Sequence, residues 1–218
     1  MIFSLKTEWP IAIDSPDNIN CWGVYRDCSV SEQFFVDIEK YFKRSCSLLD
    51  LGSAGSGLTN QAIERGHISC SLEGSDYWLR ENRLDGDTPQ AKIWKQYLNK
   101  NVFTCDISHN FELSDYYDPE HKIYQFDVIT MWEVFEHIFT DRLETTIENI
   151  KKHLKHDGVF VGSISLINDA PLGIELHKSI FTAQQWMDIL SPHFIIEENR
   201  TFTKVRNENN SLHILLRK

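Results

Sequence analysis

Short apolar stretches alternate with helical patterns along the chain from about residue 46 onward. The stretch 126–131 (FDVITM) is almost continuously apolar, which is typical of strands buried on both faces of a parallel sheet. Other stretches are shorter and end at turn residues. Together these patterns predict strands at Ser47–Leu51, Ile68–Glu73, Val102–Cys105, Phe126–Met131, Val159–Ser165, Phe194–Glu197 and Leu212–Leu216.

Helices are predicted between these strands. One follows the Gly/Ser turn after residue 51 and runs through Ile63 and Glu64. A second is expected from Asp141 to His156 and should end at a turn containing Gly158, because glycine readily adopts the positive φ of a helix end. A third begins after Thr182, whose hydroxyl can cap the helix N-terminus. Strand–helix alternation with right-handed crossovers predicts an α/β fold with an open, doubly wound sheet.

The pattern predicts one domain with an N-terminal extension. Residues 1–45 are expected to form a cap or entrance helices, with helical spacing over Val30–Phe42, and residues 46–218 form the main domain. Residues 77–100 lengthen the connection after the second predicted strand. Insertions beside the carboxyl ends of strands often shape a binding cleft.

Composition excludes several classes of protein. The 218 residues are 41% hydrophobic and 25% charged, which is typical of one globular domain. The net charge of −10 argues against binding to long nucleic acid, which needs clustered Lys and Arg. The sequence has neither an apolar stretch long enough for a membrane span nor a signal peptide at its start. Five cysteines without a CxxC pair favour reduced thiols over a zinc ribbon, so we expect a cytoplasmic protein.

A glycine turn and two acidic residues point to an adenosine cofactor. The run DLGSAGSG at 50–57 predicts a strand, a turn of small residues and a helix N-terminus that a ligand can approach. Its order GxxGxG differs from the GxGxxG of dinucleotide-binding dehydrogenases, which disfavours a nicotinamide oxidoreductase. Glu73, at the end of the next strand, can accept hydrogen bonds from both ribose hydroxyls. Asp106 follows the third strand and could meet the adenine amino group.

Residues 50–57, Glu73, Asp106 and the run FDVITMWEVFEHI at 126–138 together resemble the class I S-adenosylmethionine-dependent methyltransferases, over roughly residues 46–218. The resemblance implies S-adenosylmethionine as cofactor and a Rossmann-like, seven-stranded, mostly parallel sheet with its last strand reversed and helices on both faces. Ala54 and Ser56 stand where the family pattern D-x-G-x-G-x-G most often has glycine, and both are small enough for a modest change in geometry. The implied cofactor contacts are Asp50, Gly52, Ser53, Ala54, Gly55, Glu73, Gly74, Ser75, Asp106, Ile107, Trp132 and Glu133.

A possible metal site follows the fourth predicted strand. If a helix begins at Glu133, then Glu133, Glu136 and His137 share one of its faces. Carboxylates favour Mg²⁺ or Mn²⁺, and the histidine shifts the preference toward Mn²⁺, Fe²⁺, Co²⁺ or Zn²⁺. His177, in the loop after the fifth strand, would overhang the same crevice.

The spacing E-x-x-E-H resembles the metal-dependent O-methyltransferases, which include small-RNA 3′-terminal 2′-O-methyltransferases and ubiquinone-biosynthesis O-methyltransferases. The resemblance implies that Glu133, Glu136, His137 and His177 hold a divalent metal (Mg²⁺ or Mn²⁺), which grips two adjacent acceptor hydroxyls and lowers the pKa of one of them.

The acceptor and the base stay open at this stage. Without a metal, His137 or His177 would act as the general base. A metal suits a hydroxyl nucleophile, so a sugar hydroxyl of a small-molecule or glycan acceptor is favoured, followed by a small aromatic acceptor such as a catechol and by the 3′-terminal ribose of RNA. A non-enzymatic alternative is a methyltransferase-like partner subunit that binds the cofactor without turnover.

Overall fold

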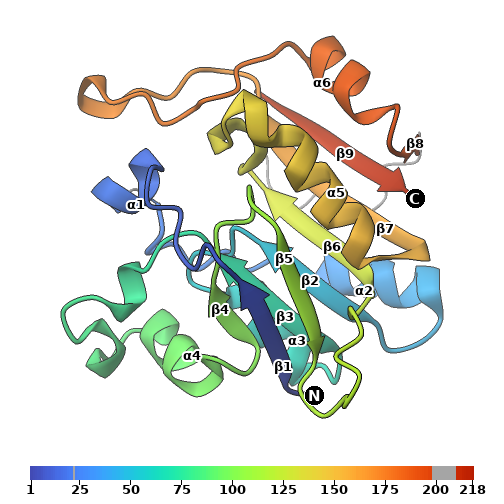
Figure 1. The fold of residues 1–218 in the computed structure, drawn as a ribbon. Coiled ribbons are helices and arrows are strands. Elements are labelled where there is room, and N and C mark those ends of the chain that lie inside the picture. The colour runs from blue at the N-terminus through green and yellow to red at the C-terminus, as the bar shows by residue number, and fades with distance from the viewer. Residues whose placement is uncertain (22, 198–209) are drawn as a thin grey trace.

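A central sheet of seven strands forms the middle layer of the computed structural model, which describes residues 1–21, 23–197 and 210–218 (Figure 1). The strand order across this sheet is β4-β3-β2-β6-β7-β9-β8. In chain order its strands are β2 (Ser47–Leu51), β3 (Ile68–Glu73), β4 (Val102–Thr104), β6 (Phe126–Trp132), β7 (Leu154–Ser165), β8 (Ile195–Ile196) and β9 (Ser211–Arg217).

The direction of the strands confirms the fold predicted from the sequence. β4, β3, β2, β6 and β7 pair in parallel, whereas β9 is antiparallel to both β7 and β8. The last strand is therefore reversed in a sheet whose other strands run in one direction. Parallel strands need crossover connections, and the helices between them supply these connections.

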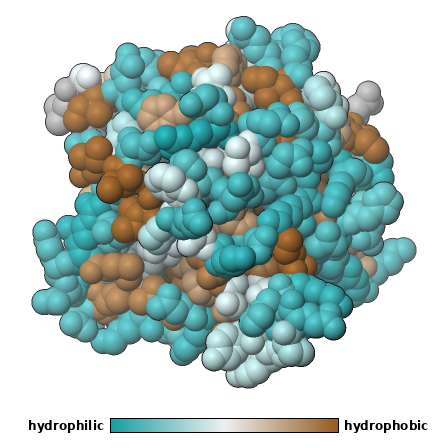
Figure 2. Space-filling model, viewed as in Figure 1, coloured by the Kyte–Doolittle hydropathy of each residue, from teal (hydrophilic) through white to brown (hydrophobic). Residues whose placement is uncertain are grey.

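Helices cover both faces of the sheet. On one face lie α5 (Leu143–His153) and α6 (Ala183–Leu190), whose apolar residues share a core with Leu49 and Leu51 of β2. On the other face lie α2 (Glu32–Phe42) and α3 (Gly57–Glu64), which share a second core with Leu48. Successive residues of a strand point to opposite faces, so β2 supplies both cores. A smaller core surrounds Trp94 of α4 (Pro89–Tyr97), within the predicted insertion. Large apolar side chains are thus mostly internal, and the surface in Figure 2 mixes hydrophilic residues with small hydrophobic groups.

A second sheet was not predicted. β1 (Phe3–Thr7) pairs antiparallel with β5 (Phe111–Asp115), with Phe3 opposite Asp115. Both strands carry buried phenylalanines that join the core under α5. The pairing joins segments that are far apart in the sequence, so no local hairpin signal marks it.

The predicted end of the second helix is wrong. α5 stops at His153, and Leu154 is already extended (φ −90°, ψ 131°) and begins β7, where it pairs with Phe126. Gly158 therefore lies within a strand. A Cβ there would lie 2.8 Å from Leu154 Cδ1 and 3.0 Å from the Asp127 carbonyl oxygen, so close packing explains this glycine.

The N-terminal segment crosses the carboxyl ends of the strands. The Ala12 amide donates to the Gly74 carbonyl (2.8 Å), and the Asp106 amide donates to the Trp9 carbonyl (2.9 Å). The short helix α1 (Pro16–Asn20) follows and lies on the side toward which β6 points in Figure 1. Among the helices in the described ranges, none has the length and apolar character to cross a membrane.

Candidate active site

A cavity of about 700 Å³ opens at the carboxyl ends of the parallel strands. It is lined by the ends of β2, β3 and β6, by the loops after β4 and β7, and by several described residues of the N-terminal segment, the first Ala12 and the last Cys28. Ligands of open α/β sheets bind at this edge, because the connections diverge there and leave a crevice.

The turn after β2 has a backbone that favours glycine at several positions. Gly52 has φ +74°, and Ala54 (φ 44°) and Ser56 (φ 60°) are also left-handed. Ala54 and Ser56 therefore retain the backbone shape that glycine adopts without strain. Gly52 also has a steric role: a Cβ on it would lie 2.4 Å from Val134 Cγ2, directly beside Glu133. Gly52 and Ala54 line the cavity.

We expect Gly52→Ala to destabilise the protein by about 2–5 kcal/mol, the sum of left-handed strain and overpacking against Val134. Gly66→Ala is the matched control, because Gly66 has a similar φ of +82° but nothing within 4 Å of its Cβ position. It should cost only the strain, about 1–2 kcal/mol. Urea denaturation of both variants measures the difference, and equal losses would show that the contact with Val134 costs nothing.

Three of the predicted cofactor residues do not line the cavity. The Gly55 amide donates to the Arg26 carbonyl (2.8 Å), and a Cβ on Gly55 would lie 2.4 Å from that oxygen. Asp50 is buried and accepts from Thr130 Oγ1 (2.7 Å), while Ser53 Oγ lies 3.1 Å from Ser56 Oγ. Gly55 makes room for the N-terminal segment, and the polar side chains stabilise the turn from inside.

The two strand-end acids lie on the cavity wall together with Gly74, Ser75 and Ile107. Glu73 accepts from the Ala54 amide (2.5 Å) and the Ser75 amide (2.9 Å), so it connects the turn after β2 to the end of β3. Burial raises the pKa of Glu73, and these backbone hydrogen bonds act against the rise. Asp106 accepts from the Ser108 amide (2.9 Å) and hydroxyl (2.6 Å) through Oδ1.

The segment after β6 is not the α-helix that the sequence analysis considered. Trp132 ends β6, Glu133 is left-handed (φ 54°), and Phe135–His137 form a single 3₁₀ turn. Ligand atoms of Glu136, His137 and His177 nevertheless lie within 4.8 Å of one another. Glu133 lines the same cavity but lies outside this group. We call Glu136, His137 and His177 the acid–imidazole cluster.

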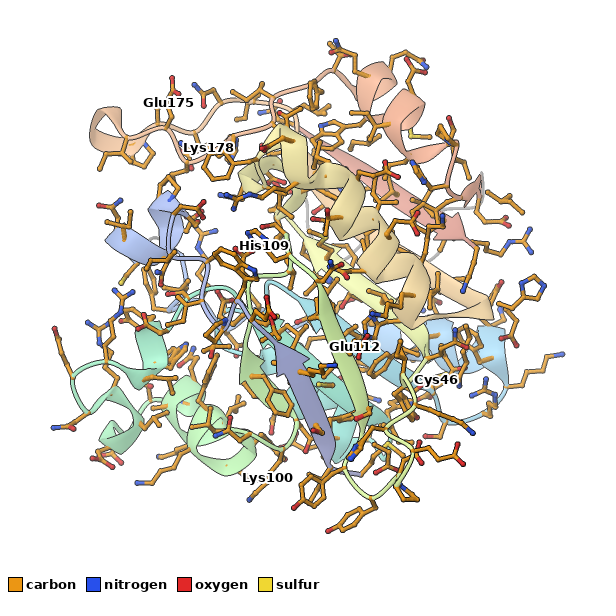
Figure 3. The ribbon with its side chains drawn as sticks, viewed as in Figure 1. Cys46, Lys100, His109, Glu112, Glu175 and Lys178 are labelled. Atoms are coloured by element: carbon orange, nitrogen blue, oxygen red, sulfur yellow. The ribbon has the colours of Figure 1, made fainter. Side chains whose placement is uncertain are left out.

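The loop after β7 brings His177 to this position. The amides of Lys178 and Ser179 both donate to the Glu136 carbonyl, at 2.6 Å and 3.0 Å, so the loop is fixed to the turn that carries Glu136. Figure 3 shows Glu175 and Lys178 on this loop, near α1. His177 Nδ1 lies 2.6 Å from the Ile167 carbonyl, and a proton on Nδ1 leaves the lone pair on Nε2.

Glu136 is the most unusual group of the site. It is 1% exposed, and neither carboxyl oxygen has a hydrogen-bond partner among the described residues. Burial raises its pKa to about 8, against the opposing charge of His137. Burial also lowers the pKa of His177. Burial disfavours charge on His137 too, but the adjacent carboxylate of Asp17 outweighs it and raises the pKa of His137. A buried carboxyl without partners is costly unless a ligand satisfies it.

Comparison with known proteins decides the family. A family model described as "Methyltransferase domain" matches residues 26–203, which is most of the chain. The chain belongs to this methyltransferase family. No curated protein sequence matches it.

Solved structures share the fold of this methyltransferase. PH0226 from Pyrococcus horikoshii OT3 aligns with a TM-score of 0.57 and 12% identity, over 97% of this chain and 95% of that one. The 1,6-didemethyltoxoflavin-N1-methyltransferase of Burkholderia thailandensis, solved with S-adenosylhomocysteine, aligns with a TM-score of 0.58 and 19% identity, over 93% of this chain and 84% of that one. The glycopeptide N-methyltransferase MtfA, solved with S-adenosyl-L-methionine, aligns with a TM-score of 0.54 and 11% identity, over 87% of this chain and 94% of that one. Identities this low establish the shared fold alone.

The structure adds residues to the methyltransferase cavity that the sequence analysis missed. Asp14 forms an ion pair with Arg142 (2.6 Å), and Asp17 lies 2.6 Å from His137. These acids belong to the N-terminal segment, and no spacing pattern relates them to residues after β6. Only the folded chain brings the two regions together.

Proposed function

We propose that the protein is an S-adenosylmethionine-dependent O-methyltransferase that uses a divalent cation held by the acid–imidazole cluster. The observation that carries the proposal is Glu136: a buried carboxyl group on the cavity wall, whose oxygens have no hydrogen-bond partner among the described residues, next to two imidazoles. Carboxylate oxygens with imidazole nitrogens form a donor set that fits Mn²⁺ or Mg²⁺.

The cofactor half of the cavity also fits the proposal. Gly52 and Ala54 offer bare backbone, and Glu73 and Asp106 offer acceptors for ribose hydroxyls and an amino group. Trp132 and Glu133 line the same cavity, and Glu133 Oε1 is buried without a hydrogen-bond partner among the described residues. When bound, S-adenosylmethionine supplies an electrophilic methyl group.

The cluster residues would prepare the nucleophile. A divalent cation supplies Lewis acidity, which makes a neighbouring hydroxyl easier to deprotonate. Glu136, His137 and His177 would hold the cation. Glu133 lies outside this cluster and would contact the cofactor. In the metal-free alternative, His177 would instead be the general base, because its lowered pKa keeps the imidazole neutral near pH 7 with a lone pair on Nε2.

The charge of the cavity favours a neutral acceptor. Carboxyl side chains outnumber guanidinium groups on its wall by seven to two. The acids are Asp14, Asp17, Glu73, Asp106, Glu133, Glu136 and Asp169, and the arginines are Arg26 and Arg142. A bound divalent cation would not balance this excess. A phosphorylated or carboxylated acceptor would be repelled, whereas a sugar with adjacent neutral hydroxyls would not.

We therefore expect a neutral sugar acceptor to be methylated with a kcat/KM at least about 10-fold above that of its monophosphate, because one close like-charge contact in a partly buried site costs more than about 1.4 kcal/mol. The measurement compares the two compounds at the same Mn²⁺ concentration and at low and high salt. The preference should shrink as salt screens the repulsion. A preference for the phosphate would contradict the neutral-acceptor proposal.

The function itself is tested by transfer of a labelled methyl group from S-adenosylmethionine into a panel of glycans, catechols, short RNAs and primary amines. Each reaction is run with Mn²⁺ and again with EDTA. Label in the hydroxyl acceptors that disappears with EDTA supports the proposal. Equal labelling with EDTA would assign the chemistry to a histidine base, and label confined to amines would replace O-methylation with N-methylation. Binding of S-adenosylmethionine without turnover of any acceptor would favour the partner-subunit alternative.

A further inference from the structure

The cavity has an apolar wall on the side of the acid–imidazole cluster. Phe139, Ile167 and Leu176 line the cavity, and we call these three residues the apolar wall. None of them belongs to the three hydrophobic cores formed by the described residues. Leu176 is nevertheless only 4% exposed, whereas Ile167 is 51% exposed. The packing of the sheet and its helices therefore does not explain why these positions are apolar.

The apolar wall borders the acceptor part of the cavity. Leu176 directly precedes His177, and the Ile167 carbonyl lies 2.6 Å from His177 Nδ1. Phe139 follows His137 by two residues. The loop after β7 also lies away from β3 and β4, because β2 and β6 separate these strands from β7 in the sheet. The wall is thus beside the groups that would prepare the nucleophile, and the proposed adenosine contacts at the ends of β3 and β4 lie further along the crevice.

Hydrogen bonds fix the two segments that form the wall. Ser179 is buried; its amide donates to the Glu136 carbonyl (3.0 Å), and its hydroxyl donates to the Ile138 carbonyl (2.7 Å). The Leu176 amide donates to the Asp169 carbonyl (2.9 Å). The segment after β6 and the loop after β7 are therefore joined next to the wall. A preformed apolar surface can bind an apolar group without the entropic cost of ordering a loop.

The wall and the charge of the cavity together restrict the acceptor. A free sugar would leave the apolar side chains in contact with water, whereas an apolar group bound there would remove them from water. An anionic lipid would supply the apolar group, but the excess of carboxyl groups in the cavity would repel its head group. A neutral sugar that carries an apolar aglycone suits both parts of the cavity.

We propose that the methyl acceptor is a neutral glycoside whose apolar aglycone binds to the apolar wall, while hydroxyls of its sugar meet the acid–imidazole cluster. This inference rests on the proposed function, because it takes a neutral sugar as the part that is methylated. Ile167 is then a specificity-determining residue: it contacts the aglycone and leaves the reacting hydroxyl to the cluster.

Hexyl and methyl β-D-glucopyranoside test the proposal, because they differ only in the length of the aglycone. Their binding to the protein saturated with S-adenosylhomocysteine is measured by nuclear magnetic resonance titration, below the critical micelle concentration of the hexyl compound. We expect the hexyl glucoside to bind at least about 10-fold more tightly, since each fully buried methylene improves affinity by about fourfold. Equal affinities, or no binding of the hexyl glucoside, would overturn the proposal.

Ile167→Ser and Ile180→Ser form a matched pair of variants. Both isoleucines lie in the loop after β7 and are similarly exposed (51% and 47%), but Ile180 lies outside the cavity. We expect Ile167→Ser to weaken binding of the hexyl glucoside by about 3–10-fold and to change binding of the methyl glucoside by less than about twofold. Ile180→Ser should change neither affinity. Equal effects of the two substitutions would contradict the role given to Ile167, and melting temperatures control for folding.

Two further outcomes are separated by the same variants. If the protein self-associates and Ile167→Ser abolishes the association in sedimentation velocity, the wall is a contact between two copies and the proposal is overturned. The binding measurements involve neither Mn²⁺ nor methyl transfer. Failure to find EDTA-sensitive O-methylation would therefore refute the proposed function without changing these affinities, whereas equal affinities of the two glucosides would refute the aglycone site alone.

Discussion

Glu136→Gln is expected to lower methyl transfer by about 100-fold or more, although it changes one oxygen atom to an amide nitrogen. Glu136 is the carboxylate of the acid–imidazole cluster, and both of its oxygens lack hydrogen-bond partners within the described structure. An amide is a much weaker ligand for Mg²⁺ or Mn²⁺ than a carboxylate and carries no charge to offset that of the cation. Mn²⁺ affinity should therefore fall together with kcat.

The same substitution is expected to stabilise the metal-free protein above neutral pH. The pKa of Glu136 is raised to about 8 from 4.5 by burial, so the folded state binds a proton that the unfolded state releases between these values. The contribution of protonated Glu136 to the free energy of unfolding is complete below pH 4.5. It is lost as the pH rises toward 8, by about 1.4 kcal/mol per pH unit for a fully titrating group. Glutamine does not titrate and removes this loss.

Denaturation at pH 5 and pH 8.5 in EDTA, for wild type and variant, isolates the contribution of Glu136. The difference in unfolding free energy between Glu136→Gln and the wild type should increase with pH.

Glu144→Gln is the matched control for activity, because Glu144, Glu148 and His193 also form a three-residue group with metal-ligating atoms, but one at the surface outside the cavity. Full activity of Glu136→Gln would refute the role given to this carboxylate.

Glu73→Ala is expected to weaken binding of S-adenosylhomocysteine by about 100-fold or more. Glu73 accepts from two backbone amides and lies on the cavity wall, so its loss releases the turn after β2 and removes the acceptors that we propose for the ribose. Each hydrogen bond to a charged group contributes about 1.5–3 kcal/mol, and two of them account for a change of this size. Isothermal titration calorimetry measures it directly.

Asp115→Ala provides the control for this prediction. Asp115 also ends a strand, and it accepts from the amide two residues further on, Tyr117, at 3.0 Å, as Glu73 does from Ser75. It lies outside the cavity. Its substitution should leave the affinity unchanged, and a loss equal to that of Glu73→Ala would show that capping a strand end, and no contact with the cofactor, explains the effect.

The sheet could be predicted from the sequence because its strands are short apolar stretches bounded by turn residues. Glu73 and Asp106 followed from the same pattern, since a residue that ends a parallel strand must lie at the edge where ligands bind. β1 and β5 could not be predicted, because their pairing joins distant segments and neither has a hairpin turn. The end of α5 was misplaced because Gly158 was taken for a helix end, whereas close packing inside β7 requires it.

Local spacing named candidate site residues but not their arrangement. The prediction grouped Glu133 with Glu136 and His137 on one helix face, whereas the backbone there is a 3₁₀ turn and Glu133 lies outside the acid–imidazole cluster. Gly55 was predicted to contact the cofactor, because a glycine turn does not reveal which group approaches its backbone. In the structure the backbone of Arg26 approaches Gly55. Asp17 could not be found at all. Its contact with His137 depends on the path of the N-terminal segment, which tertiary contacts decide.

The most direct measurement is a crystal structure with S-adenosylhomocysteine and Mn²⁺, with data collected for anomalous scattering from manganese. The account predicts one anomalous peak between Glu136, His137 and His177, with the cofactor product along Gly52, Glu73 and Asp106. A cluster without a peak at saturating Mn²⁺, or a peak only at the exposed group of Glu144, Glu148 and His193, would contradict it.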